Sequence, residues 1–293
     1  MKLKFDVTDR CQPDPFIFED CGKLYLYVTG EKGVEAYSTD DLFGVWHYEG
    51  IIASIDGRHS YWAPSITKYN GRYYLYFSCS SNDECQFMHA MVADFPLGPF
   101  TNPTCFYKRF SIDSHVVETE KGLFLWYSED KKDCDRIGTR VFVDKLIDPM
   151  TPANQPREVI VPTMDEEIFK RGRNGDKDWH TIEGAFWFRE GDWQYVMYSG
   201  GCFDNDSYHI GYVAARSQES DLTRVQFVKR LRHGPLKAET WVRFPYGSPA
   251  NRKGHSHECP FCFADNPYGL RTHSKLAWIW VRVVCPFVSC RNF

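Results

Sequence analysis

Three carboxylates, Asp14, Asp113 and Glu183, each stand at the start of a strand-like run of aromatic and β-branched residues. A carboxylate can take a proton from water and a carboxylic acid can give one to a departing oxygen, so two such groups support general acid–base catalysis. A third negative charge nearby raises the pKa of the acid and keeps it protonated near neutral pH. Taken singly, Asp14 is also typical of an Asp-Pro turn, Asp113 of a strand-end cap and Glu183 of a solvated strand end. The chemical interpretation therefore depends on whether the fold brings the three together.

The carboxylates belong to a pattern that recurs along the chain. Each copy has a strand-like run, a short turn and a second run rich in aromatic residues, which is typical of a β-hairpin. The predicted hairpins cover residues 14–28, 62–77, 113–127 and 183–199, and a weaker fifth begins at Gly254-His255-Ser256. Further strand-like pieces follow the first four hairpins at residues 34–37, 87–92, 139–143 and 209–214.

The repeat predicts an all-β fold, a five-bladed β-propeller with four-stranded antiparallel blades around a central funnel. Residues 1–293 are expected to form a single catalytic domain whose last blade, from about residue 250, is atypical. The first strand of every blade starts at the same end of the funnel. We therefore expect these strand starts to converge: Asp14, Trp62, Asp113, Glu183 and His255. Unpaired charges are costly to bury, which favours a functional reason for three carboxylates there.

The strand starts resemble the motif set of glycoside hydrolase family 43. The motifs in chain order are Pro13-Asp14-Pro15-Phe16, Tyr61-Trp62-Ala63-Pro64, Ile112-Asp113-Ser114 and His180-Thr181-Ile182-Glu183-Gly184, and Gly254-His255-Ser256 resembles the late Gly-His motif of the family. The resemblance runs from about Pro13 to about His255. It implies a five-bladed propeller that cleaves arabinose- or xylose-containing glycosides with inversion of configuration.

The same resemblance implies a role for each carboxylate. Asp14 would be the general base, Glu183 the general acid, and Asp113 the group that raises the pKa of that acid and orients it. The residues agree with this chemistry, because an inverting hydrolase needs its two carboxyl groups roughly 6.5–9.5 Å apart. Two blades that face each other across a funnel provide such a gap, whereas neighbours on one strand do not.

Three further residues are candidates for binding the substrate, and each has a structural alternative. Trp62 fits a sugar-binding surface and a core aromatic equally well. His180 fits a residue that positions Glu183, although a hydrogen-bonded structural histidine is the more common case. Phe203 follows Ser199-Gly200-Gly201-Cys202 at the exit of the Glu183 hairpin and fits a pocket wall or, more simply, a loop aromatic.

His255 is the candidate metal residue. In the resembled family the matching histidine lies near the channel axis, so a structural calcium is the metal that the resemblance allows, and no cofactor is required. Residues 255–262 also contain two histidines and a Cys-x-x-Cys pair, although the His-x-His spacing is too compact for a usual zinc finger. Beyond His255 the apolar run 276–287 lacks the Tyr-His and Arg pattern expected of the last blade, which puts ring closure in question.

Composition excludes some classes of function. A net charge of −4 and a pI near 6.2 argue against a nucleic-acid partner, which requires a basic face. No apolar run approaches eighteen residues, so no membrane span is predicted. The start, Met1 to Asp6, lacks a secretory signal, which predicts a cytoplasmic protein. Without such a signal the 11 cysteines are expected to be free thiols rather than a disulfide framework.

The segment from Asp165 to Asp178 is polar and charged. It separates the third and fourth copies, and its composition predicts a long surface loop with solvated charges near the rim of the funnel. Such a loop would cover one side of a bound substrate.

The combined expectation is an inverting hydrolase that releases terminal α-L-arabinofuranosyl residues from small arabino- or arabinoxylo-oligosaccharides. β-Xylosidase and endo-arabinanase activities remain open, since loops set the shape of a sugar pocket and motifs do not. A propeller that binds glycans without catalysis is the alternative from a different class. The three carboxylates weigh against it, because a binding protein does not need a protonated Glu beside two Asp.

Overall fold

The computed structural model describes residues 3–7, 13–82, 84–230, 240–242 and 281–283. β-Strands dominate this part of the chain, and its only helix is a short 3-10 turn, η1 (Asp165–Glu167). The predicted all-β class is therefore confirmed. Within the described residues, no helix has the length and apolar character needed to cross a membrane. The fifth hairpin predicted from Gly254-His255-Ser256 lies outside them.

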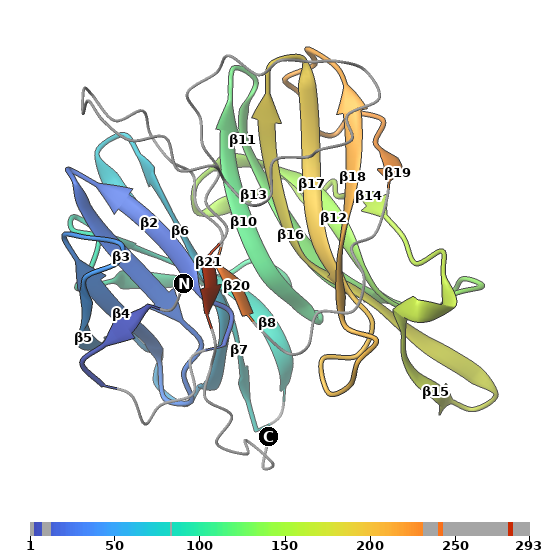
Figure 1. The fold of residues 1–293 in the computed structure, drawn as a ribbon, viewed down its shortest axis with the longest axis horizontal. Helices are drawn as coiled ribbons and strands as arrows, with labels where there is room; N and C mark the ends of the chain where they lie inside the picture. The colour runs from blue at the N-terminus through green and yellow to red at the C-terminus, as the bar shows by residue number, and fades with distance from the viewer. Residues whose placement is uncertain (1–2, 8–12, 83, 231–239, 243–280, 284–293) are drawn as a thin grey trace.

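Four consecutive groups of strands, called here the first to fourth repeats, make up most of the described chain (Figure 1). The first contains β2 (Phe16–Asp20), β3 (Lys23–Val28), β4 (Val34–Thr39) and β5 (Val45–Ala53), with β1 (Lys4–Phe5) parallel to β5. The second contains β6 (His59–Tyr69), β7 (Arg72–Ser81), β8 (Glu84–Ala93) and β9 (Thr101–Cys105).

The third repeat contains β10 (Ser111–Thr119), β11 (Gly122–Lys131), β12 (Gly138–Asp148), β13 (Thr151–Pro152) and β14 (Arg157–Ile160). The fourth contains β16 (Lys177–Glu190), β17 (Trp193–Gly200), β18 (His209–Arg216) and β19 (Val228–Arg230). A separate pair joins β20 (Thr240–Val242) to β21 (Val281–Val283). In Figure 1 the blue first repeat lies on the left of the view and the yellow-to-orange fourth repeat on the right.

The predicted hairpins form because local turn chemistry and strand patterning agree. Asn70 and Gly71 both have positive φ, at 50° and 78°, as the two central residues of a tight hairpin turn of the primed type require. Along β17 the side chains alternate between partly exposed and buried, so one face of the strand packs inward. In β7 most side chains are buried, because this strand packs on both faces.

Aromatic side chains fill the spaces between the repeats. Tyr61 and Phe77 pack together between the first and second repeats, and Tyr107 stacks on Tyr127 at the junction of the second and third. Trp126 is buried in the core shared by the third and fourth repeats. Burying a large apolar side chain contributes about 1.5–3 kcal/mol, so the high aromatic content stabilises the contacts between sheets.

Backbone pairing also joins neighbouring repeats. Gly30 and Tyr61 form an isolated bridge between the first and second. Gly138 of β12 pairs with His180 of β16 in a parallel register between the third and fourth. A Cβ atom on Gly138 would lie 1.9 Å from the His180 carbonyl oxygen, so this close approach requires glycine.

The segment predicted as a loop from Asp165 to Asp178 is largely a hairpin, so that prediction was wrong. After η1 the chain forms β15 (Ile168–Asn174), turns at Gly175 with φ of 71°, and returns as β16. The Arg173 guanidinium lies over the Trp179 ring at 4.9 Å, and such cation–π contacts support strands that carry many charges. The hairpin projects from the fourth repeat, as the strand labelled β15 shows in Figure 1.

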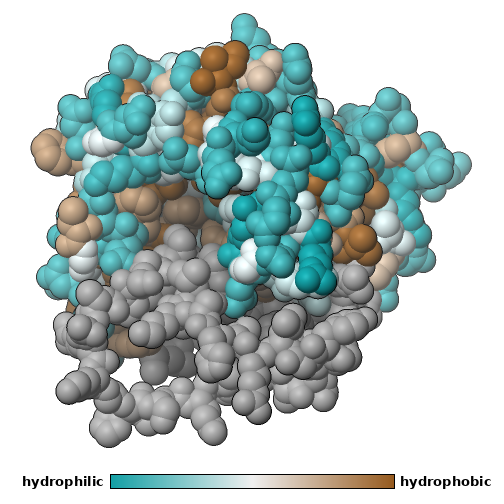
Figure 2. Space-filling model, turned by 90° about the horizontal axis from the view of Figure 1, so that it is seen from above, coloured by the Kyte–Doolittle hydropathy of each residue, from teal (hydrophilic) through white to brown (hydrophobic). Residues whose placement is uncertain are grey.

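The surface and the thiols agree with the composition. On the face drawn in Figure 2, hydrophilic surface predominates and hydrophobic side chains occur in small groups, which is usual outside a packed core. The cysteines that the structure describes form no disulfide with one another, as predicted. These are Cys21, Cys79, Cys85, Cys105, Cys134 and Cys202.

Candidate active site

A recurring backbone feature shapes the start of the first strand in each repeat. Asp14, Ala63, Asp113 and Gly184 have positive φ angles of 53°, 44°, 59° and 65°. In the second, third and fourth repeats the pairing with the next strand slips at this point, which is typical of a β-bulge. Glycine adopts the left-handed region freely, and aspartate is enriched there. We call these four the bulge residues.

The bulge residues correct the predicted equivalence of the repeats. We predicted that Asp14, Trp62, Asp113 and Glu183 occupy the same place in each copy. The structure places both aspartates on the bulge, whereas Trp62 and Glu183 stand one residue before it. The carboxylates therefore leave their strands from adjacent positions, not from equivalent ones.

Asp113 and Glu183 are brought together where the third and fourth repeats meet. The N–H of Gly184 donates to Oδ2 of Asp113 at 3.0 Å, so the bulge that follows Glu183 also fixes the aspartate. Tyr208, in the loop between β17 and β18, donates its O–H to Oε1 of Glu183 at 3.1 Å. Asp113 thus has a fixed partner across the junction, and Glu183 has one in the loop between β17 and β18.

The electrostatics of Glu183 show that the three predicted carboxylates share one region. Glu183 is half-buried, and burial raises its pKa well above the usual value. The negative charge of Asp113 raises this pKa further, the hydrogen bond from Tyr208 lowers it, and the charges of Asp14 and Asp130 add to the increase. Burial and the neighbouring charges thus favour the protonated form of this carboxyl group, which is the form that a general acid uses.

Asp14 lies in a different environment, where the first and second repeats meet. Thr29 donates its O–H to Oδ2 of Asp14 at 2.7 Å and accepts the N–H of Ala63 at 3.0 Å. Asp14 is exposed, so water can reach its carboxylate. Access to water is the first requirement for a carboxylate that is to act as a general base.

His115 joins aromatic rings from three of the repeats. The buried His115 ring of β10 stacks on Phe186 of β16 at 4.2 Å and lies 6.2 Å from the ring of Phe16 of β2. Nδ1 of His115 accepts the backbone N–H of Trp187 at 3.2 Å. Rings from the first, third and fourth repeats thus meet, in agreement with the predicted convergence of the first strands.

Trp62 and Phe203 are both exposed aromatics. Trp62 is 37% exposed and directly precedes Ala63. The N–H of Ala63 donates to the Thr29 hydroxyl, which in turn donates to Asp14. This position favours a binding surface over a core role. Phe203 is 60% exposed and packs on Phe169 of β15 at 5.8 Å, so the structure places it on an outer loop as the simpler alternative had it.

His180 is buried and fully occupied by structural partners. Its Nε2 lies 3.0 Å from Nη1 of Arg136, and its Nδ1 lies 3.3 Å from the carbonyl oxygen of Ile137. Arginine only donates, so Nε2 accepts and Nδ1 carries the proton. These contacts are those of a structural histidine, which stabilises the start of β16 rather than contacting substrate.

Sequence reasoning missed Tyr208, Thr29 and Asp130. Tyr208 directly precedes the strand-like run 209–214, and the rule that singled out polar residues at strand starts would have found it. Thr29 instead follows β3, and Asp130 lies near the end of β11. No pattern in the sequence distinguishes either residue.

The metal expectation stays a prediction. His255 lies outside the described residues. Within the part of the chain that the structure describes, no group of three or more His, Cys, Asp or Glu side chains is arranged to hold a metal ion.

Comparison with known proteins shows which family this chain belongs to. The model of "Glycosyl hydrolases family 43" matches residues 7–224. The chain belongs to this family. An extracellular exo-α-(1→5)-L-arabinofuranosidase of Cellvibrio japonicus is 26% identical over 236 residues, which cover 70% of this chain and 64% of the relative. A probable arabinan endo-1,5-α-L-arabinosidase C of Aspergillus clavatus is 36% identical over 76 residues.

The Aspergillus match covers 23% of this family 43 chain, and the chain spans about a quarter of the length of that relative. Solved structures share the fold over longer stretches. The endo-arabinase of Bacteroides thetaiotaomicron has a TM-score of 0.66 at 20% identity, with 84% of this chain and 89% of that one covered. The α-L-arabinofuranosidase of Lactobacillus brevis has a TM-score of 0.64 at 16% identity, with 80% and 79% covered.

Proposed function

We propose that this family 43 protein is an inverting glycoside hydrolase in which Asp14 is the general base, Glu183 the general acid and Asp113 the group that raises the pKa of that acid and orients it. One observation carries the proposal. Glu183 is half-buried among negative charges that raise its pKa, whereas Asp14 is exposed to water. Two carboxyl groups in such different environments suit the roles of acid and base.

The reaction follows from these roles. Asp14 takes a proton from a water molecule as the water oxygen bonds to the anomeric carbon. Glu183 gives its proton to the glycosidic oxygen as the bond from that oxygen to the anomeric carbon breaks. The water attacks from the face opposite the leaving group, so the configuration inverts. Asp113 and Tyr208 hold the acid, because one binds the bulge next to Glu183 and the other binds its carboxyl group.

The proposed substrate is a terminal α-L-arabinofuranosyl group on a small oligosaccharide. The names of the Cellvibrio and Aspergillus relatives support arabinose. β-Xylosidase activity is the second candidate, because a relative from Humicola insolens is named xylosidase/arabinosidase and is 22% identical over 183 residues.

We also propose that the four repeats and the C-terminal segment close into a five-bladed propeller with four-stranded blades.

Hydrolysis of aryl α-L-arabinofuranoside and aryl β-D-xylopyranoside tests the proposal, with NMR detection of the first anomer formed. On aryl glycosides whose leaving group needs protonation, Glu183→Gln is expected to lose activity, whereas Glu190→Gln, at the far end of the same strand, is expected to retain it. Release of one sugar with the inverted anomer would support both enzyme class and substrate. Unchanged turnover by Glu183→Gln would overturn the acid assignment, and a folded wild-type protein that cleaves neither sugar would favour the glycan-binding alternative.

A further inference from the structure

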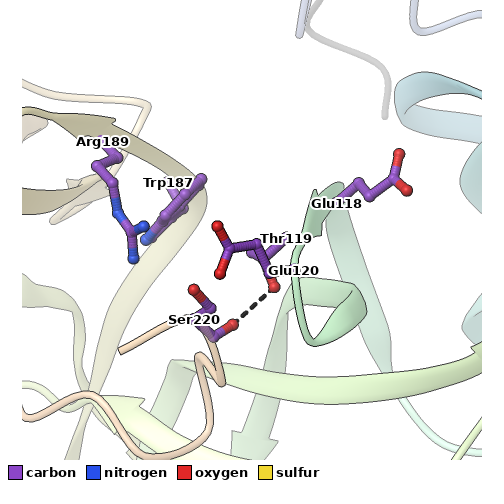
Figure 3. A pocket seen from close by; sticks show the side chains of 6 residues that line it. All are labelled: Glu118, Thr119, Glu120, Trp187, Arg189 and Ser220. Carbon is purple, nitrogen blue, oxygen red and sulfur yellow. Dashed lines mark hydrogen bonds between the residues drawn. The ribbon is translucent and has the colours of Figure 1, made fainter. Parts of the chain in front are cut away.

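A cavity of about 530 Å³ lies away from the carboxylates, at the other end of the first strands of the third and fourth repeats. Trp187 is four residues beyond Glu183 on β16, roughly 13 Å at about 3.3 Å per strand residue. The volume falls within the ~300–1,000 Å³ range of small-molecule sites. We call this cavity the distal pocket. It is lined by Glu118, Thr119, Glu120, Trp187, Arg189 and Ser220 (Figure 3).

Trp187 forms a fixed wall of the distal pocket. Its indole Nε1 donates to Oε1 of the buried Gln194 at 3.0 Å, and its backbone N–H donates to His115 at 3.2 Å. The ring is therefore held in one orientation without a ligand, which reduces the entropy that binding would cost. Figure 3 shows Arg189 on one side of Trp187 and Glu120 on the other.

The polar groups around this ring include both donors and acceptors. Arg189 is anchored through Nη2, which donates to the Glu219 carbonyl at 2.8 Å, while its buried Nε has no hydrogen-bond partner among the described residues. Glu120 is exposed, and Figure 3 shows its carboxylate turned toward Trp187, whereas the Glu118 carboxylate points away. Thr119 Oγ1 donates to the Ser220 carbonyl at 2.6 Å and closes the floor between the two repeats.

We propose that the distal pocket is a second carbohydrate-binding site that holds a neutral sugar ring between Trp187 and Glu120, on the side of the indole opposite Arg189, whose guanidinium lies over the ring at 5.9 Å. Sugars present C–H faces that pack on an indole, and hydroxyls that donate to a carboxylate such as that of Glu120. Glu120 disfavours anionic ligands, while the nearby charge of Arg189 disfavours cationic ones. The choice of pentose rests on the proposed function, but the site itself does not.

A binding experiment on the full chain tests this site directly. Protein labelled with nitrogen-15 at tryptophan, in the Glu183→Gln background that prevents hydrolysis, would be titrated with arabinotriose and with xylotriose. The Trp187 indole N–H signal, assigned through Trp187→Phe, is expected to shift saturably with at least one probe. In Glu120→Ala the Kd is expected to rise about tenfold, since hydrogen bonds to charged groups are the stronger ones. Glu19→Ala, which removes an exposed carboxylate near the end of β2, the corresponding strand of the first repeat, is the matched control and should leave the Kd unchanged.

Each outcome decides the proposal. Calorimetry provides a count of sites that does not depend on the assignment. Two bound probes per chain in Glu183→Gln, with the affinity of one of the two sites about tenfold weaker in the additional Glu120→Ala variant, would support the proposal. The absence of a saturable Trp187 shift with either probe, or an equal loss of affinity in Glu19→Ala, would overturn it. Wild-type turnover of aryl glycosides is measured separately, so failure of the distal pocket and failure of the proposed reaction are distinguishable.

Discussion

The junction between the first and second repeats and the junction between the third and fourth both use a bulge residue whose N–H crosses to the preceding repeat. At the first, Ala63 donates to the hydroxyl of Thr29, which in turn donates to Asp14. At the other, Gly184 donates to the carboxylate of Asp113 itself. The backbone geometry is shared, and the acceptor differs: a neutral hydroxyl in one case and a negative charge in the other.

This difference sets the chemistry of the neighbouring carboxyl group. Asp14 stays exposed, with a neutral hydroxyl between it and the next repeat. Glu183 is half-buried, and its pKa is raised first by burial and then by the charge of Asp113. A shared backbone feature can thus support a base at one junction and an acid at the other, because the roles depend on burial and adjacent charge.

The largest expected effect separates base from acid. Asp14→Asn should lower kcat/KM by about 10²–10⁴-fold with every leaving group, because activation of water is lost each time. Glu183→Gln should lose about as much on a natural oligosaccharide but far less on a dinitrophenyl glycoside, whose leaving group departs without protonation. Steady-state kinetics on both substrates checks this. The same leaving-group dependence in both variants would contradict the division of roles.

The next effect concerns the charge of Asp113. An acid with a raised pKa works below that pKa, and its activity is lost as pH rises through it. Asp113→Asn keeps an oxygen to accept the Gly184 N–H but removes the charge, so the pKa of Glu183 should fall and the alkaline limb of the pH–rate profile should move to lower pH. Activity at neutral pH should drop about 10²-fold, the low end of the range of general acid–base catalysis.

Asp130 gives a graded control for this shift. Its charge raises the pKa of Glu183 less than that of Asp113 does, so Asp130→Asn should move the alkaline limb in the same direction by a smaller amount. A larger shift in Asp130→Asn than in Asp113→Asn would show that Asp113 is not the dominant charge.

Tyr208 should act in the opposite direction. Its hydrogen bond lowers the pKa of Glu183, so Tyr208→Phe should raise this pKa and move the alkaline limb to higher pH. Loss of one hydrogen bond should reduce kcat by roughly two- to tenfold. The pH–rate profile distinguishes loss of this hydrogen bond from a structural defect, because a structural defect would not shift the alkaline limb. Tyr212→Phe, on the neighbouring β18, is the control and should leave the alkaline limb where it is. A shift of the limb to lower pH would exclude Tyr208 as a partner of the acid.

The smallest effect is expected at the first junction. Thr29→Val removes the donor to Asp14 and the acceptor for Ala63, and should lower kcat by roughly two- to fivefold, because Asp14 is exposed and water can replace the lost donor. Thr29→Ser keeps the hydroxyl and should restore the rate. The alkaline limb set by Glu183 should not move in either variant, and a shift there would show that the two junctions are electrostatically coupled.

The sequence was sufficient for the hairpins because their signals are local. The turn at Asn70-Gly71 and the alternation along 193–199 specify register within a few residues, and the structure has strands at both. The hairpin that contains β15 was missed because a charged stretch lacks hydrophobic periodicity. Its stability comes from side-chain contacts such as that of Arg173 with Trp179, which composition does not reveal.

The site was predictable in its residue types and not in its geometry. Asp14, Asp113 and Glu183 were found because each begins a strand. The one-residue offset between Asp113 and Glu183 depends on a positive φ, which leaves no mark on the hydrophobic pattern. The contact of Tyr208 with Glu183 depends on how a loop folds back between β17 and β18, which is a tertiary property.

The left-handed backbone also accounts for the types of the three carboxyl residues: Asp14 and Asp113 have positive φ, whereas Glu183 does not. A left-handed backbone selects for short polar side chains that bond locally, so among ionisable residues aspartate is the natural occupant. A longer acid is better placed on the residue before it, as Glu183 is before Gly184. The conformation of one residue per repeat therefore limits which carboxylic acids that position can carry.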